Sequence, residues 1–116
     1  MRTTRLDDLL SEDATARLLA FKRDVVRALP GSVEDVVLFG SRARGDAQED
    51  SDYDVAVLLR DGLADDQDIR GRISDVTWHC LVEGWHVQAI AMNASAFRPP
   101  RSELAMRIAA EGVPVP

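Results

Sequence analysis

The sequence predicts an α/β (α+β) domain, in which a small mixed β-sheet has its helices packed on one face. Two observations support this fold class. Apolar residues recur at helical spacing in long segments, and short apolar runs bounded by glycine or polar residues alternate with those segments. The expected order is helix, strand, strand, helix, strand, helix. We therefore expect the long helices to cover one face and a site to lie at strand ends on the other.

The first half of the chain is expected to form an arm, a helix and a strand. Residues 1–10 mix charge with leucine, which predicts a loosely docked arm or a short helical turn. Ser11 is a suitable N-cap, and Pro30 with Gly31 ends the helix that follows. Its apolar positions are Ala14, Leu18, Phe21, Val25 and Ala28. The apolar segment 33–39 then predicts a buried strand.

The second half is expected to alternate strand and helix. In the helix that Asp65 and Asp66 open, Ile69, Ile73, Val76 and Cys80 form an apolar stripe, so Cys80 is expected in the core. Ser102 is expected to cap the last helix. The expected elements are the short helix 41–45, the polar loop 47–51, the strand 52–59, the helix 65–84, the strand 85–92, the turn 94–97 and the helix 102–112.

Size and charge restrict the class of protein. With 116 residues and 46% hydrophobic composition, residues 1–116 are expected to form a single domain. The net charge of −6 argues against non-specific nucleic-acid binding, which depends on Lys and Arg. The single cysteine fits a reducing compartment, and neither a membrane span nor a signal peptide is evident. These features predict a cytoplasmic protein with no membrane association.

The segment 38–59 carries the chemistry. An apolar run ends at Gly40, which lets the backbone approach a ligand closely, and Ser41 follows at the start of a short helix, where phosphate is favoured. Asp52 and Asp54 open the next strand, and their spacing of two places both side chains on one face. Two such carboxylates repel each other unless a cation lies between them, and Mg²⁺ is the usual cation where phosphate is present.

This Gly-Ser turn, followed after a short linker by Asp-x-Asp and an apolar strand, resembles the DNA polymerase β-like nucleotidyltransferases. The fuller string GSRARG…SDYDVAVLL is similar to their minimal nucleotidyltransferase (MNT) branch, which is found with HEPN proteins in toxin–antitoxin modules. The resemblance implies the polymerase β-like nucleotidyltransferase fold. It also implies ATP or another NTP as substrate, a two-metal Mg²⁺ site on Asp52 and Asp54, and phosphate binding at Gly40 and Ser41.

Other residues near this motif are weaker candidates. Arg42 and Arg44 are suited to bind phosphate, although they also fit a solvated short helix, and Ser51 either contributes to nucleotide binding or caps the turn before the aspartates. The family has a third carboxylate on the next strand, where this chain has Gln88. Glutamine is a poor Mg²⁺ ligand and no base. His86 lies two residues before Gln88 and is expected on the same face.

The resemblance leaves three functional hypotheses. The first is a Mg²⁺-dependent enzyme that transfers NMP, AMP from ATP above all, to an acceptor hydroxyl on a HEPN toxin partner, which is an antitoxin role. The second is a catalytically impaired module that binds nucleotide and neutralises its partner by complex formation. The third is an accessory subunit that only docks a partner through apolar surface. Trp78 and Trp85 are expected to be packing or interface residues and not to stack on a base.

Overall fold

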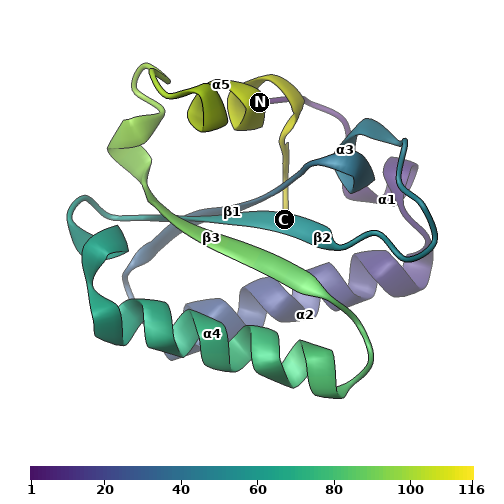
Figure 1. The fold of residues 1–116 in the computed structure, drawn as a ribbon, viewed down its shortest axis with the longest axis horizontal. Helices are drawn as coiled ribbons and strands as arrows, with labels where there is room; N and C mark the ends of the chain where they lie inside the picture. The colour runs from purple at the N-terminus through teal and green to yellow at the C-terminus, as the bar shows by residue number, and fades with distance from the viewer.

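The structure is a computed structural model that describes residues 1–116. Its centre is a mixed four-stranded sheet in the order β3-β2-β1-β4 (Figure 1). β1 is antiparallel to β2 and β4, whereas β2 and β3 are parallel. The strands are β1 Val33–Phe39, β2 Tyr53–Leu59, β3 Val87–Asn93 and β4 Val113–Pro114. The predicted fold class is confirmed, and β4 is an addition that was not predicted from the sequence.

Three of the helices begin at side-chain caps. The Ser11, Asp66 and Ser102 side chains accept hydrogen bonds from backbone N–H groups three residues later, at 3.1, 3.1 and 3.0 Å. Each bond satisfies a donor that a helix start leaves unpaired. The predicted caps at Ser11 and Ser102 are thereby confirmed. The helices are α1 Leu6–Leu9, α2 Glu12–Ala28, α3 Ser41–Arg44, α4 Gln67–Val82 and α5 Glu103–Glu111, with one-turn 3₁₀ helices at Leu63–Asp65 and Ala94–Ala96.

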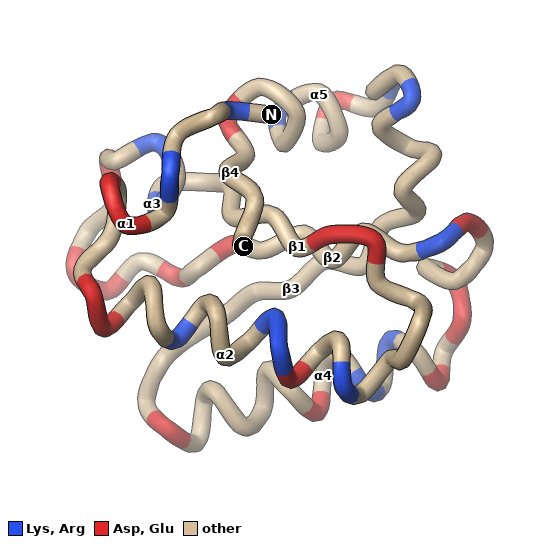
Figure 2. The backbone as a smooth tube through the Cα atoms, turned by 180° about the vertical axis from the view of Figure 1, so that it is seen from behind, with Lys and Arg blue, Asp and Glu red and all other residues tan.

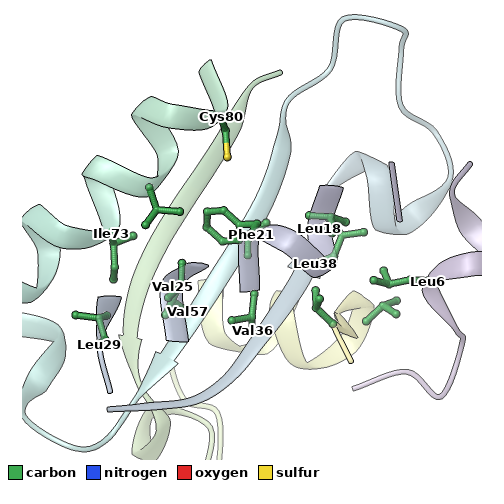
Figure 3. Close-up of a cluster of buried hydrophobic side chains, with 14 of the residues drawn as sticks. Leu6, Leu18, Phe21, Val25, Leu29, Val36, Leu38, Val57, Ile73 and Cys80 are labelled. Carbon is green, nitrogen blue, oxygen red and sulfur yellow. The ribbon is translucent and has the colours of Figure 1, made fainter. Parts of the chain in front are cut away.

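The main core lies between the sheet and the pair α2 and α4 (Figures 1 and 3). Phe21 and Val25 of α2 are 1% and 0% exposed, because the helical spacing turns both toward the sheet. Each such side chain contributes about 1.5–3 kcal/mol on burial. Cys80 and Trp85 also belong to this core, as predicted, and burial raises the pKa of the Cys80 thiol to about 11. Trp78 is 62% exposed.

The opposite face of the sheet is partly covered by α5, which the sequence analysis did not place there. Ile108 is fully buried in a second cluster, with Val37, Phe39, Ala56 and Leu58. The strands β1 and β2 are apolar on both faces, so the face opposite α2 and α4 must also be shielded from water. Helix α5 packs on part of that face. Figure 1 shows α5 above the sheet, with α2 and α4 below it. The long helices do share one face, and the last helix shields part of the other.

The short helical turn that was one of the two expectations for residues 1–10 is confirmed as α1, whereas the loosely docked arm is wrong, because this segment is firmly docked. Leu6 is 2% exposed within the main core. The Arg2 guanidinium donates to the Ala43 carbonyl at 2.6 Å, and the Arg2 N–H donates to the Gly112 carbonyl at 2.9 Å. These contacts tie the arm to the short helix α3 and to the end of α5. None of the helices is long and apolar enough to cross a membrane.

Candidate active site

The turn after β1 lies directly beside the start of β2. Phe39, the last residue of β1, pairs in register with Asp54. Gly40 follows at φ +76° and ψ −159°, a conformation open almost only to glycine. A Cβ atom on Gly40 would overlap the Asp54 carboxylate. The Asp54 carboxylate can therefore lie against the Gly40 backbone only because residue 40 has no side chain.

Asp54 lies on the α5 side of the sheet, because β2 alternates and its next even-numbered residues, Ala56 and Leu58, pack under α5. Asp52 immediately precedes β2, and its charge acts on the Asp54 carboxyl. Both aspartates are half-buried. Burial raises the pKa of the Asp54 carboxyl, and the charges of Asp52 and Glu111 raise it further, whereas Arg44 lowers it. Figure 2 shows further acidic segments at the end of the molecule that carries α1, α3 and the loop into β2.

These residues suit a hard divalent cation. Two carboxylates supply the oxygen ligands that Mg²⁺ prefers, and a cation between them would relieve the repulsion between the charges of Asp52 and Asp54. No group of three or more His, Cys, Asp and Glu side chains is arranged to hold a metal ion. An ion held here would complete its coordination with water or with phosphate oxygens, as Mg²⁺ commonly does.

Ser41 and Arg44 stand at the two ends of the short helix α3. Ser41 begins this helix directly after Gly40, and its side chain is half-buried. The Arg44 guanidinium is exposed and contacts Asp46 at 3.2 Å and Glu111 at 3.2 Å. The structure therefore brings Gly40, Ser41 and Arg44 together beside Asp54.

Glu111, which the sequence analysis did not identify, also enters the site. It is the last residue of α5, and its Oε1 atom accepts a hydrogen bond from the Gly40 N–H at 3.0 Å. Gly40 and Glu111 are 71 residues apart, and their contact depends on how α5 crosses the sheet. No local pattern in the sequence indicates such a contact.

The strand β3 places Gln88 where the sequence analysis expected it. Gln88 pairs in register with Asp54 across the parallel strands, so both side chains lie on the same face of the sheet. The Gln88 side chain is exposed. His86 precedes the strand and is also exposed, and it helps to line a cleft of about 380 Å³ beside Tyr53 and Trp85. No hydrogen bond joins the His86 imidazole to the aspartates.

Arg42 and Ser51 hold the loop that leads into β2. The Arg42 guanidinium donates to the carbonyls of Ser51 at 2.8 Å and Glu49 at 3.1 Å, and it lies 4.5 Å from the centre of the Tyr53 ring. The Ser51 hydroxyl accepts from the Gln48 N–H at 2.8 Å. Tyr53 and Asp54 point to opposite faces of the sheet, so Arg42 is turned away from the Asp54 side. Arg42 thereby positions the loop before Asp52.

This placement predicts that Arg42→Ala loosens the loop. The variant should lose about 1–2 kcal/mol of stability, because it removes hydrogen bonds to backbone carbonyls and a cation–π contact. Arg42→Lys should recover only part of this loss, since an ammonium group cannot bridge two carbonyls as a guanidinium does. Urea unfolding is the measurement, with the exposed Arg70→Ala on α4 as the control. Equal midpoints for Arg42→Ala and wild type would contradict this role.

Comparison with known proteins identifies the family. The family model of the nucleotidyltransferase domain matches residues 19–102. A protein of Methanocaldococcus jannaschii named "putative protein adenylyltransferase" is 46% identical over 41 residues. That match covers 35% of this chain and 41% of the relative, so it spans less than half of either protein.

Solved structures with the same fold are more distant in sequence. A "putative nucleotidyltransferase" from Sulfolobus solfataricus has a TM-score of 0.56 at 20% identity, over 98% of this chain and 89% of that one. A toxin–antitoxin with AMP-PNP has a TM-score of 0.58 at 19% identity, over 84% and 71%. A mutant of the toxin–antitoxin MntA–HpeT has the same score and identity, over 87% and 71%. Because the family model spans both the turn after β1 and the start of β2, the chain belongs to the nucleotidyltransferase domain family, as its motif predicted.

Proposed function

We propose that this protein transfers a nucleoside monophosphate, AMP from ATP, to an acceptor hydroxyl with Mg²⁺ held by Asp52 and Asp54. The observation that carries the proposal is the position of Asp54, which is half-buried beside Gly40 and close enough to Asp52 for the two carboxylates to repel each other. Members of this family act on a nucleoside triphosphate, and the fold generally uses a divalent metal. Residues 1–116 would act together as one minimal domain.

Each proposed role follows from a position in the site. Asp52 and Asp54 hold the metal, whereas the Gly40 and Ser41 N–H groups and the Arg44 guanidinium bind the β- and γ-phosphates. When bound, the metal stabilises charge on the phosphates and lowers the pKa of an attacking hydroxyl. The acceptor hydroxyl gives its proton to water, and its oxygen bonds to the α-phosphorus as the bond from that phosphorus to the bridging oxygen breaks and pyrophosphate leaves. Arg42 and Ser51 position the loop that carries Asp52.

We further propose that the acceptor is a hydroxyl of a partner protein, a HEPN-type toxin that this protein neutralises. Two proteins of similar fold are toxin–antitoxin systems, one of them with AMP-PNP, and a sequence relative is named as a protein adenylyltransferase. The MntA–HpeT structure is a mutant in which two aspartates, two residues apart, are changed to glutamate. Asp52 and Asp54 have the same spacing. The net charge of −6 suits a basic surface on such a partner.

Transfer can be tested with ATP labelled at the α-phosphate or at the γ-phosphate. The partner to test first is the protein encoded beside this one, which we expect to be short and helical with an Arg-x4-His motif. Label from α-labelled ATP should become attached to the partner, with pyrophosphate released, and label from γ-labelled ATP should not. Attachment of the γ-label would indicate phosphorylation and contradict the proposal.

Gln88 supports a second candidate function, a module that binds nucleotide but transfers it poorly and neutralises its partner by complex formation. Gln88 faces the same side of the sheet as Asp54 and carries no charge. General-base catalysis is typically worth about 10²–10⁴ in rate. We therefore expect slow transfer in wild type and faster transfer in Gln88→Asp, whereas Gln67→Asp at the start of α4 should change nothing. An unchanged or lower rate in Gln88→Asp would show that Gln88 does not stand in for a missing carboxylate.

A further inference from the structure

The Glu111 carboxylate occupies the position where a phosphate would be bound. Its Oε1 atom is 3.0 Å from the Gly40 nitrogen, and Arg44 Nη1 lies 3.2 and 3.3 Å from Oε1 and Oε2. The Glu111 side chain is only 15% exposed. An N–H group and a guanidinium are the donors that the proposed function assigns to the nucleotide's phosphates. The two anions therefore compete for the same partners.

Glu111 does not take the place of the missing third carboxylate. In the sheet order β3-β2-β1, Gln88 flanks Asp54 on one side and Phe39 with Gly40 flanks it on the other. Glu111 approaches from the Gly40 side, to which the proposed function assigns the phosphates. The carboxylate that Gln88 would replace lies on the opposite side of Asp54.

The backbone around Glu111 is fixed, so only its side chain is free to leave. The Gly112 N–H donates to the Ile108 carbonyl at 2.7 Å, and a Cβ atom on Gly112 would overlap that carbonyl and the Val37 side chain. Val113 then pairs with Leu38 in the sheet. Rotation of the Glu111 side chain would free Gly40 and Arg44 without moving α5.

We infer that Glu111 is a specificity-determining residue, an internal anion that keeps the phosphate position closed to ligands lacking a metal. This inference rests on the proposed function. A metal-free phosphate must displace Glu111 and also meets the charges of Asp52 and Asp54. A Mg²⁺–triphosphate gains contacts with both aspartates, and these contacts offset the free energy needed to displace the Glu111 side chain. Glu111 thus lowers affinity for all phosphate ligands, and most for the metal-free ones, because its displaced charge still repels the ligand that carries more negative charge.

The test compares wild type with Glu111→Gln and Glu111→Ala, and Glu103→Gln at the other end of α5 is the matched control. Calorimetry measures the affinity for Mg·ATP, and for inorganic tripolyphosphate with a chelator present. Both Glu111 variants should bind Mg·ATP about tenfold more tightly or better, since a charged hydrogen-bond partner no longer has to be displaced. Tripolyphosphate affinity should rise more, and the chemical shift of the Gly40 amide should then respond to tripolyphosphate.

Each contrary outcome has a distinct meaning. Weaker Mg·ATP binding by both Glu111 variants would make Glu111 a ligand of the metal–nucleotide complex and overturn the inference. Affinities equal to those of wild type would overturn the inference alone and leave the proposed function standing. Thermal unfolding should show that all four proteins are folded. If none of them then bound any phosphate ligand, both the inference about Glu111 and the proposed function would be overturned.

Discussion

The double substitution Asp52→Asn with Asp54→Asn is expected to abolish Mg²⁺-dependent nucleotide binding while the domain remains folded. Both side chains are proposed metal ligands, and an amide cannot replace a carboxylate for Mg²⁺. Mutation of residues that only support metal ligands typically weakens metal affinity by about 10–100-fold. Loss of both ligands should therefore weaken Mg·ATP binding by at least ~100-fold. Calorimetry with Mg·ATP is the measurement.

A control with the same change in charge separates the metal site from general electrostatics. Glu49→Gln with Asp50→Asn removes two charges from the exposed loop just before the site. This variant should bind Mg·ATP within a few-fold of wild type, because loop charges are largely screened by solvent. If the Asp52/Asp54 variant also retained wild-type affinity, the metal assignment would be wrong.

Asp54 also makes stability depend on pH in a direction opposite to most aspartates. Its pKa is raised by burial and by Asp52, so the folded state favours the protonated form. Its stabilising contribution is complete below the unfolded-state pKa of about 3.9 and is lost as the pH rises through the folded-state pKa. Without metal, Asp54→Asn should therefore melt above wild type at pH 7 and lose that advantage near pH 3. Thermal unfolding across this range is the measurement.

Gly40→Ala is the second change with a large expected effect. The backbone at Gly40 has φ +76°, which costs an alanine about 1–3 kcal/mol. The added methyl group would also displace the Asp54 carboxylate and fill the space beside the Gly40 N–H. We expect lower stability by this amount, and Mg·ATP binding weakened by at least about tenfold through loss of hydrogen bonds to charged groups.

Gly62 provides the matched control for this substitution. It has φ +86° in the turn after β2, and a Cβ atom there meets nothing within 4 Å. Gly62→Ala should lose about 1–2 kcal/mol of stability through the left-handed backbone and keep its nucleotide affinity. Denaturant unfolding measures the cost of backbone strain in both variants, and calorimetry measures whether the added methyl group blocks nucleotide binding. A folded Gly40→Ala protein that bound Mg·ATP like Gly62→Ala would place the phosphates elsewhere.

Features that depend on neighbours in the sequence were predictable. The first strand was expected at 33–39, which is where β1 lies, because an apolar run between polar segments needs no knowledge of the rest of the fold. The shared face expected for Asp52 and Asp54 rests on strand alternation alone and stays a prediction for Asp52, because β2 begins at Tyr53. The placement of Gln88 on the strand next to that of Asp54 was also expected, although there the family resemblance supplied which strands are neighbours.

Features that depend on distant packing were not predictable. Glu111 reaches Gly40 only because α5 crosses the second face of the sheet, and helical spacing shows that α5 is amphipathic without showing which face it covers. The direction of Arg42 was equally open, since a guanidinium fits a phosphate, a carboxylate or a carbonyl. Residues 1–10 were expected to form a loosely docked arm or a short helical turn, because Leu6, Leu9 and Leu10 span little more than one helical turn and do not show what they pack against.

The most direct test of the proposed metal and phosphate site is to locate a bound ion in solution. Mn²⁺, which can replace Mg²⁺ in oxygen-ligand sites, broadens the NMR signals of nearby amides. With Mn²⁺ and ATP present, broadening should centre on Gly40, Ser41 and the segment 52–54, and the Asp52→Asn/Asp54→Asn protein should not show it. Broadening centred instead on the acidic residues of α1 and the start of α2, and unchanged in that variant, would contradict the site.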